Sequence, residues 1–331
     1  MNKKQPQIGE LIKQNPALAR QFFYSSEEEA ERGEDDPLQE ENFTPVKGLV
    51  HKYTHEVLVL LTSNNEHNWR SKAPALHVHK YTHEVLVLLT SNCARYCRFC
   101  TRRRKTFSEK KEIQEDDLKK MAEYIKSQPE VYDVIISGGD PLIRPILLEK
   151  ALKLFSRLPQ IKVIRVGTRL HFSDPEAINS KVLNALKMVK KQPLYIMAHF
   201  EHPVELTKKT REAIKKLQKV ATMILSQTVS LRGVNDKVEV LEELFVKLTQ
   251  IGVKPYYFLR CDPVKGAEHF VVDFKKEIEI FTELRRRLNG IACPLYVIDT
   301  PGGFGKVPGP LDFWDFVPDY YYDFKGKRIK I

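Results

Sequence analysis

Residues 85–104 read VLVLLTSNCARYCRFCTRRR, an apolar run followed by a loop that holds three of the chain's five cysteines. Cys93, Cys97 and Cys100 have the spacing C-x3-C-x2-C. Three thiolates can hold three corners of a 4Fe–4S cube and leave the fourth iron open to another ligand. A tetrahedral zinc site would need a fourth nearby ligand, and no His or Cys follows closely. The spacing and the basic flank therefore favour an iron–sulfur cluster over three unrelated thiols.

Short apolar runs alternate with amphipathic stretches from Val85 onward, and this alternation indicates the fold class. The stretches between the runs repeat apolar residues at intervals of three and four positions, as helices do. Strands that alternate with such helices are parallel and joined by right-handed crossovers. The sequence therefore predicts an α/β fold, a partial (βα)6-type parallel barrel with an N-terminal extension. The expected strands are 85–90, 131–137, 162–168, 194–199, 222–227, 254–259 and 294–299, and the expected helices are 8–23, 114–127, 146–158, 175–190, 204–220, 238–252 and 274–288.

The polar motifs of the chain follow the ends of the expected strands. In parallel barrels the reactive groups lie at the C-terminal ends of the strands. One mouth of the barrel should therefore collect all of these motifs. In chain order they are the cysteine loop, SGGDPL at 137–142, GTR at 167–169, HFEHP at 199–203, Gln227, the pair Cys261 and Asp262, and DTPGGFGK at 299–306.

The composition of the 331-residue chain limits which other classes of protein it could belong to. Five cysteines do not suggest a secreted disulfide scaffold, and clustered free thiols fit a reducing cytoplasm. No apolar run is long enough to span a membrane, and the start MNKKQPQIGELIKQ lacks the apolar segment of a signal peptide. The net charge of +11 makes nucleic-acid binding the competing hypothesis. The basic residues are spread along the expected helices, however, so anionic small molecules explain local clusters such as 102–104 equally well.

A duplication of fourteen residues interrupts the start of the barrel. HKYTHEVLVLLTSN occurs at 51–64 and again at 79–92, where it leads into Cys93. The second copy is therefore the expected first strand. The first copy is an added strand, a displaced segment or an accident of duplication, and we favour the accident. The expected division is a polar, partly helical extension over 1–50, an insertion over 51–78, the barrel domain over 79–307 and a tail over 308–331.

The extension contains nine acidic residues between positions 27 and 41 and few apolar ones. Such a composition is typical of segments that cannot bury much apolar surface. We therefore expect this stretch to be mobile or laid on the surface.

Six motifs, in this order, resemble the lysine 2,3-aminomutase family of radical S-adenosylmethionine enzymes. They are CRFCTRRR (97–104), SGGDPL (137–142), HFEHP (199–203), LRGVND (231–236), CDPVKGAEHF (261–270) and DTPGGFGKVP (299–308). The resemblance extends from about residue 36 to residue 307. It implies an isomerase that uses three cofactors: a 4Fe–4S cluster, S-adenosylmethionine and pyridoxal 5′-phosphate.

By this resemblance, the three cysteines bind three irons, and the methionyl amine and carboxylate of S-adenosylmethionine chelate the fourth. Gly138 and Gly139 would let the backbone approach that methionyl group, since glycine has no side chain to obstruct it. Asp140 belongs to the same cofactor-binding motif. An ordinary strand-to-helix turn is the alternative reading of the glycine pair. His199 and Gln227 are expected near the nucleoside.

Lys306 matches the family's pyridoxal phosphate lysine. A Schiff base needs a lysine whose amine is sometimes neutral, which burial and neighbouring charge can arrange. The phosphate also needs a cation, and Lys80 stands where the family often has arginine. Arg169 is a second candidate for this phosphate cradle. Lys52 competes with Lys80 only if the first copy of the duplication forms the core strand.

The charges expected around the substrate favour a basic amino acid. Arg102 is placed to pair with the α-carboxylate, and Asp262 and Asp299 match the two carboxylates that grip the distal ammonium of lysine. The resemblance thus implies conversion of L-lysine to β-lysine, started by a radical that is formed from S-adenosylmethionine. An electron donor such as flavodoxin or ferredoxin is implied as a partner, and a homo-oligomer stays open.

Three alternatives remain at this stage. One is a β-lysine-forming enzyme that serves the modification of elongation factor P, and another is a related glutamate or arginine 2,3-aminomutase. The most remote is a non-catalytic iron–sulfur or nucleic-acid-binding protein, which only the net charge favours.

Overall fold

The computed structural model describes residues 8–29, 33–51, 83–103, 113–300, 305–312, 320–322 and 327–330. One nine-stranded sheet dominates this part of the chain, and each of its strands neighbours the next in sequence. The strands are β1 (Leu49–Val50), β2 (Glu84–Thr90), β3 (Asp133–Gly138), β4 (Val163–Thr168), β5 (Leu194–His199), β6 (Met223–Val229), β7 (Lys254–Leu259), β8 (Leu295–Asp299) and β9 (Lys306–Pro308). A separate antiparallel pair joins β10 (Tyr320–Tyr322) to β11 (Arg328–Lys330).

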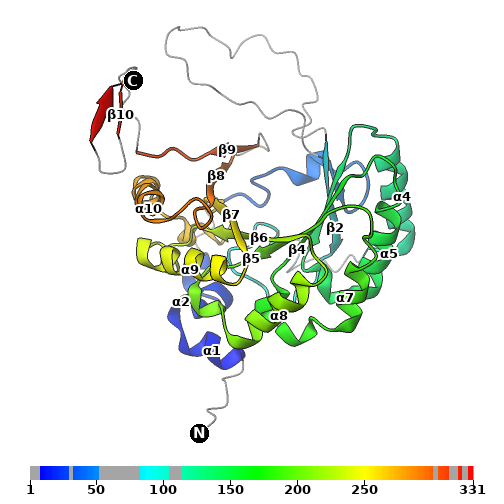
Figure 1. The fold of residues 1–331 in the computed structure, drawn as a ribbon, viewed down its shortest axis with the longest axis horizontal. Coiled ribbons are helices and arrows are strands. Elements are labelled where there is room, and N and C mark those ends of the chain that lie inside the picture. The colour runs from blue at the N-terminus through cyan, green and yellow to red at the C-terminus, as the bar shows by residue number, and fades with distance from the viewer. Residues whose placement is uncertain are drawn as a thin grey trace.

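The sheet is a partial barrel, as predicted. The strands from β2 to β8 are parallel, whereas β1 and β9 pair antiparallel at the two edges. Among the described strands β1 and β9 do not pair with each other, so the barrel stays open. Figure 1 shows the strands curving around one interior, with the two edges at the top of the view.

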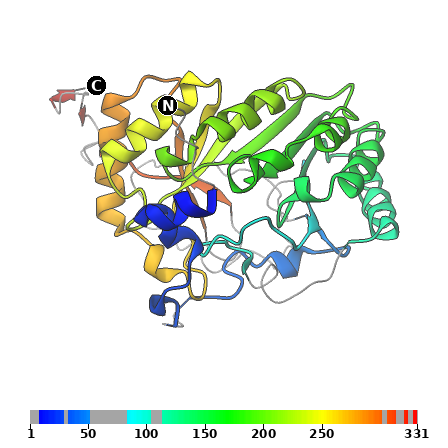
Figure 2. The same cartoon turned by 90° about the horizontal axis from the view of Figure 1, so that it is seen from below.

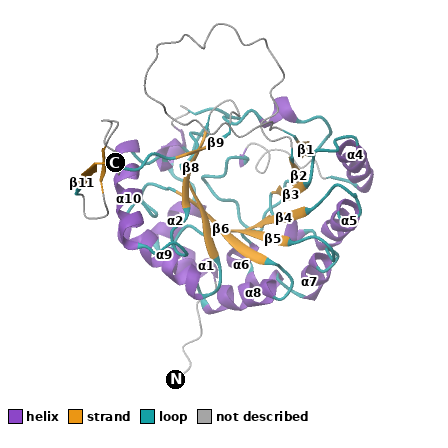
Figure 3. Ribbon diagram, turned by 45° about the horizontal axis from the view of Figure 1, so that its top comes forward, coloured by secondary structure: helices purple, strands orange, loops and turns teal. Residues whose placement is uncertain are grey.

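Helices form a layer outside the strands, as Figure 3 shows in purple around orange. The long ones connect consecutive parallel strands, which is the pattern expected for right-handed crossovers. They are α4 (Glu115–Lys126), α5 (Pro145–Phe155), α7 (Ser180–Leu186), α8 (Lys208–Gln218), α9 (Val238–Gln250) and α10 (Phe274–Arg287), with the short α6 (Leu170–Ser173) after β4. Within the described residues, none of the helices has the length and apolar character that crossing a membrane requires.

Alternation along each strand divides the side chains between two environments. In β2, Val85 and Val87 are fully buried on the face that packs against the helices. Glu84 and Leu86 point the other way and line a cavity inside the barrel. Successive side chains of a strand point to opposite faces, so the apolar half makes the core and the other half lines the interior. The interior is consequently available for a site.

Two predicted helices begin later than the apolar period suggested. The structure replaces 175–190 and 204–220 by a short 3-10 turn followed by α7 and α8. Asn179 caps α7 by accepting from the backbone N–H of Lys181, and Thr207 caps α8 by accepting from that of Thr210. A side-chain oxygen at the N-cap satisfies donors that the helix leaves unpaired, which fixes its first residue. The predicted strands and the other barrel helices are confirmed with small shifts of their ends.

The helix expected near residues 8–23 is two helices, α1 (Ile8–Gln14) and α2 (Pro16–Phe22). They join at Asn15, whose side chain caps α2 by accepting from the N–H of Leu18. Buried Ile12 and Leu18 pack against Phe172 of α6. Figure 2 shows this blue segment on the same side of the molecule as the cyan loop that carries the cysteines.

The expectation that the acidic stretch is mobile or surface-laid is wrong for two of its residues. Glu28 and Glu40 are buried. Glu28 forms ion pairs with Arg98 and Arg103, and Glu40 lies 2.7 Å from Arg102. Buried carboxylates are tolerated where cations compensate them, and here the cysteine loop supplies the cations. Glu28 and Glu40 thus attach the extension to the site, while other acidic residues of the stretch, such as Glu34 and Asp35, are exposed.

The second copy of the duplication forms the first parallel strand, as predicted. Its residues Glu84–Thr90 are β2, which pairs parallel with β3. The first copy, apart from His51, lies outside the described residues. An addition to the prediction is β1, which pairs antiparallel with β2 and places Val50 opposite Leu86.

Candidate functional site

A cavity of about 820 Å³ occupies the interior and the mouth of the barrel. Every predicted site residue that falls in the described part of the chain lines it, although the residues come from the parallel strands β2 to β8 or the loops after them, and from β9. They are Cys93, Cys97, Cys100, Arg102, Gly138, Gly139, Asp140, Arg169, His199, Gln227, Asp262, Asp299 and Lys306. Lys80 and Lys52 lie outside the described residues. The convergence at one mouth, which the strand order predicted, is confirmed.

The cysteine loop leaves β2 and turns tightly around the thiols. The N–H of Cys100 donates to the carbonyl of Cys97, and the N–H of Arg103 donates to the carbonyl of Cys100. Burial raises the pKa of the Cys97 thiol to about 11 and raises the pKa of Cys93 and Cys100 as well. Neighbouring thiols and Asp140 add to the rise at Cys93. Buried thiols of this kind become thiolates when a metal compensates the charge.

This loop fits a 4Fe–4S cluster. Within the described residues, no three His, Cys, Asp or Glu side chains gather closely enough to hold a single metal ion. A cube does not require that, because each thiolate binds a different iron. The three thiols share one wall of the cavity, lie close enough to influence one another electrostatically, and face space for a further ligand.

The glycine pair brings the turn after β3 into contact with the cysteine loop. Gly138 has φ of +125°, and a Cβ there would lie 2.4 Å from the carbonyl oxygen of Thr90. A Cβ on Gly139 would lie 2.1 Å from the carbonyl oxygen of Asn92. The N–H groups of Gly139 and Asp140 donate to these same two carbonyls. Glycine is therefore required because two loops touch, and the approach to a methionyl group stays a prediction.

Asp140 acts within the protein as a brace between two loops. Its carboxylate accepts from the hydroxyl of Thr168 and from the backbone N–H groups of Leu142 and Arg169, at 2.8 to 3.1 Å. Burial raises the pKa of Asp140 to about 6, and the hydrogen bonds oppose that rise. These contacts join the turn after β3 to the turn after β4. They favour a supporting role over direct contact with a cofactor.

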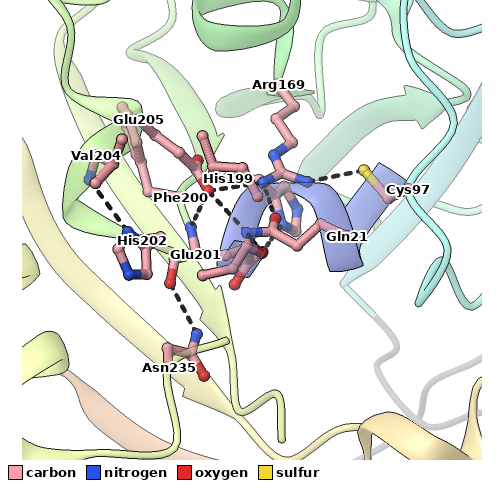
Figure 4. Close-up of polar contacts among 12 residues, drawn as sticks. Gln21, Cys97, Arg169, His199, Phe200, Glu201, His202, Val204, Glu205 and Asn235 are labelled. Atoms are coloured by element: carbon pink, nitrogen blue, oxygen red, sulfur yellow. Dashed lines mark hydrogen bonds and ion pairs between the residues drawn. The ribbon is translucent and has the colours of Figure 1, made fainter. Parts of the chain in front are cut away.

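Arg169 lies beside the thiols, and its contacts disfavour the predicted phosphate cradle. One guanidinium nitrogen is 2.9 Å from the sulfur of Cys97, and another is 2.9 Å from Glu205 and 2.5 Å from Gln21 (Figure 4). Burial alone would lower the pKa of Arg169, but the neighbouring Cys97 and Glu205 raise it. The guanidinium is therefore a buried, permanently charged group at the cluster loop.

Arg102 and its partner Glu40 both line the cavity. Glu40 accepts from Nε at 3.0 Å and from Nη2 at 2.7 Å. Such a bidentate contact fixes the plane of an arginine fork. Glu40 therefore sets the orientation in which Arg102 would meet a substrate carboxylate.

Lys306 and Asp299 form an ion pair at the edge of the sheet that β8 and β9 make. The register of β8 and β9 places these two residues directly across from each other. The ammonium of Lys306 lies 2.9 and 2.8 Å from the two carboxylate oxygens of Asp299. Gly305, at φ of +111°, makes the turn just before Lys306. The cavity thus already contains an alkylammonium held by both oxygens of an aspartate.

The remaining predicted residues lie between these walls. His199 and Gln227 are neighbours in the parallel ladder of β5 and β6, and both face the cavity. Asp262 follows β7 and lines the cavity with Arg260 and Cys261. The nucleoside contact of His199 and Gln227 stays a prediction.

Sequence reasoning missed four buried polar residues at this site. Glu201 and Glu205 have no exposed surface, and neither does Gln21 of α2, while Glu40 is almost as buried. Glu201 accepts from the N–H of Val229 at 2.6 Å, and its other oxygen is 3.8 Å from Nδ1 of His199. The motif HFEHP contained one of these acids, and its place at a strand end was the available signal.

Residues 87–245 match the family model described as the radical SAM superfamily. A protein of Aquifex aeolicus that carries the provisional name L-lysine 2,3-aminomutase is 42% identical over 90% of this chain and 70% of its own length. The L-lysine 2,3-aminomutase of Fusobacterium nucleatum is 36% identical over 82% of this chain and 57% of its own length. The glutamate 2,3-aminomutase of Clostridioides difficile is 35% identical over 85% of this chain and 60% of its own length.

The chain therefore spans less than two thirds of the length of the last two relatives. Among solved structures, a radical SAM methyltransferase from Sphaerobacter thermophilus superposes with a TM-score of 0.50 at 14% identity, over 68% of this chain and 69% of that one. An identity this low supports the fold alone.

Proposed function

Because the chain belongs to the lysine 2,3-aminomutase family of the radical SAM superfamily, a family of isomerases, we propose that it converts L-lysine to β-lysine by moving the amino group from C2 to C3. The superfamily uses a 4Fe–4S cluster and S-adenosylmethionine, and we add pyridoxal 5′-phosphate as the third cofactor. A low-potential electron donor such as flavodoxin or ferredoxin and a cytoplasmic location belong to the same proposal.

The observation that carries the choice of substrate is the ion pair of Lys306 and Asp299. Both oxygens of Asp299 accept from the Lys306 ammonium within 2.9 Å, inside the cavity that the three thiols line. The distal ammonium of a substrate lysine is chemically the same group. While Lys306 is bound to pyridoxal phosphate it would carry no free ammonium, so Asp299 could accept from the ammonium of an incoming substrate. Asp262 lines the same cavity and would supply a second carboxylate for a basic side chain.

When bound, the cluster and S-adenosylmethionine supply the radical that starts the rearrangement, and pyridoxal phosphate carries the migrating nitrogen. The residues of this chain would hold these cofactors and the substrate in fixed positions relative to one another. Cys93, Cys97 and Cys100 would hold the irons, and Lys306 would anchor the pyridoxal ring. Arg102, oriented by Glu40, would fix the α-carboxylate of the substrate.

The chain's own residues also shield the reacting atoms from water. Gly138 and Gly139 seal the turn after β3 against the cysteine loop, and Asp140 ties that turn to the next one. Positioning and exclusion of water are what a protein contributes when cofactors perform the chemistry. A substrate lysine held at both ends would span the cavity between Arg102 and Asp299.

Glutamate is the second candidate substrate, favoured by the similarity to a glutamate 2,3-aminomutase. Its distal group is a carboxylate, and Asp262 and Asp299 would repel it. An enzyme that prefers glutamate should present neutral or cationic side chains at these positions. The charges of Asp262 and Asp299 therefore favour lysine. A β-lysine-forming enzyme that serves elongation factor P modification would share the same chemistry and differ in what consumes the product.

The test is turnover by the anaerobically reconstituted protein with L-lysine, L-glutamate and L-arginine in separate reactions. We expect β-lysine from lysine and no product from glutamate, detected by mass spectrometry after derivatisation. Turnover of glutamate without turnover of lysine would contradict the substrate assignment.

Borohydride reduction tests the third cofactor in the same preparation. It should fix pyridoxal phosphate to a peptide that contains Lys306, and Lys306→Ala should abolish this label. Lys119→Ala, on the exposed face of α4, is the matched control and should keep the label. Labelling at another lysine would refute the role of Lys306.

A further inference from the structure

We propose that Arg169 is a positioning residue for the iron–sulfur cluster, which donates a hydrogen bond and a positive charge to the thiolate of Cys97 and is held there by the N-terminal helix α2. The effect that we assign to this contact is easier reduction of the cluster. This inference rests on the cluster of the proposed function and does not depend on the substrate.

The geometry places the guanidinium between the thiol and two acceptors. Nη1 of Arg169 lies 2.9 Å from the sulfur of Cys97. Nη2 lies 2.9 Å from Oε1 of Glu205 and 2.5 Å from Oε1 of Gln21. Figure 4 shows these contacts converging on one guanidinium from the cysteine loop, from α2 and from the turn after β5 that holds Glu205. An arginine fork held at one edge presents its other edge in a fixed direction, and that direction is the sulfur.

The Arg169 guanidinium is buried among aromatic rings, so it has lost most of its contact with water. Arg169 is 9% exposed, and the rings of Phe22, Phe99 and Phe172 lie 4.9, 5.6 and 5.7 Å from its Cζ. A desolvated cation needs anionic partners, and a cluster thiolate and Glu205 would supply them. Within an apolar cage of this kind, a charge–sulfur contact is only weakly screened by water.

Gln21 connects the contact to the N-terminal extension. Its side chain is fully buried, its amide oxygen accepts from Arg169, and its backbone carbonyl accepts from the N–H of Arg98 at 2.8 Å. One residue of α2 therefore binds both the arginine and the loop between Cys97 and Cys100. The amide nitrogen of Gln21 donates to the carbonyl of Ala17, which fixes the side chain on its own helix. Docking of α2 thus sets where Arg169 points.

The expected consequence is electrostatic. One-electron reduction adds a negative charge to the cluster, and hydrogen bonds to its sulfurs are among the factors that set its potential. A fixed cation at Cys97 stabilises the reduced state more than the oxidised state, so it raises the midpoint potential. Loss of this cation should make the cluster harder to reduce.

The test is a potentiometric titration of the reconstituted cluster, followed by electron paramagnetic resonance without substrate or pyridoxal phosphate. Arg169→Gln should lower the ratio of reduced to oxidised cluster at the wild-type midpoint at least tenfold, a shift of about 59 mV for one electron. Arg169→Lys, which keeps the charge but not the fork, should shift the ratio less. Gln21→Leu keeps every charge but removes the acceptor that holds Nη2 of Arg169, and it should also shift the ratio less than Arg169→Gln.

Arg98→Gln is the matched control. Arg98 lies in the same loop, next to Cys97, and its guanidinium pairs with Glu28. Its loss should change the ratio less than twofold. An Arg169→Gln protein with full iron content and a ratio within twofold of wild type would overturn the inference.

If Arg169→Gln does not retain a cluster, the other two variants decide. Wild-type ratios in both Arg169→Lys and Gln21→Leu would then overturn the inference, and lowered ratios would support it. A potential shift in protein that fails to turn over lysine would refute the proposed substrate and leave this inference standing. Assembly of a normal cluster in Cys97→Ala would refute its premise instead.

Discussion

Replacement of Asp299 by Asn should weaken the binding of lysine while leaving the cofactors in place. The side chain keeps its size and loses its charge, so the cavity wall is preserved. In the structure both carboxylate oxygens accept from an alkylammonium at 2.9 and 2.8 Å, and the carboxylate is 9% exposed. The distal ammonium of the substrate would lose this partner.

The magnitude follows from the geometry of the pair. A hydrogen bond between charged groups that is shielded from water contributes about 1.5–3 kcal/mol. With Asp262 still present, a loss of about 2–3 kcal/mol corresponds to a fall of about 30- to 150-fold in kcat/KM. The ammonium is distant from the reacting carbons, so it is held equally in the ground and transition states. The fall should therefore appear mainly in KM.

Steady-state kinetics of β-lysine formation measures this effect, and the absorbance of bound pyridoxal phosphate reports cofactor loading in the same samples. Asp116→Asn is the matched control, because Asp116 pairs with Lys119 at the same 2.9 Å on an exposed helix surface. Water screens an exposed pair, so its loss should not affect turnover. A change of less than threefold in KM for Asp299→Asn, with the cofactors loaded, would refute the assignment of Asp299 as the ammonium ligand.

Three further outcomes are expected. Gly139→Ala should push the carbonyl of Asn92 away and lower the iron content after reconstitution, whereas Gly290→Ala, which has no neighbour within 4 Å, should not. Burial lowers the pKa of His171 to about 3, so below pH 6.5 the unfolded chain binds a proton that the folded chain does not. Between pH 7.5 and pH 5, His171 should therefore contribute a loss of about 2 kcal/mol in the free energy of unfolding. Because buried acids with a raised pKa, such as Asp140, act in the opposite direction, the measured quantity is the difference in pH dependence between wild type and His171→Phe. Deletion of residues 51–78 should leave the cluster site intact and raise the free energy of unfolding by about 1–2 kcal/mol through a shorter loop, and a lost or unreconstitutable site would contradict this.

The sequence predicts those site residues that lie at the C-terminal ends of the parallel strands. Cys93, Gly138, His199 and Asp299 each follow or end a strand of the parallel sheet, and parallel strands bring their C-terminal ends to one edge. Once the alternation of strands and helices is recognised, the common mouth follows from topology. No contact between side chains has to be known for this step.

The partners of the two arginines could not be predicted in the same way. Arg102 meets Glu40 across 62 residues, and Arg169 meets Gln21 across 148. A run of acidic residues with few apolar ones is typical of a solvated segment. Composition therefore predicted that Glu28 and Glu40 are exposed, whereas both are buried. A carboxylate can be buried where a cationic side chain compensates its charge. Here that cation comes from a distant part of the chain, so only the tertiary structure shows it. For the same reason Arg169 was predicted near a phosphate, although its buried partners place it at a thiol.

The pairing of the first two strands indicates what the duplication interrupts. β1 and β2 are antiparallel neighbours with Val50 opposite Leu86, so they are the two arms of a hairpin that residues 51–83 connect. Hairpin arms are usually joined by a few residues. Without one copy, only HKYTH at 79–83 would lie between the arms, and His79 would take the place from which His51 now bonds to the hydroxyl of Tyr124 at 2.8 Å. Because both copies have the same fourteen residues, the register of β1 on β2 would survive the deletion, and we therefore interpret residues 51–78 as an insertion into a hairpin at the edge of the barrel.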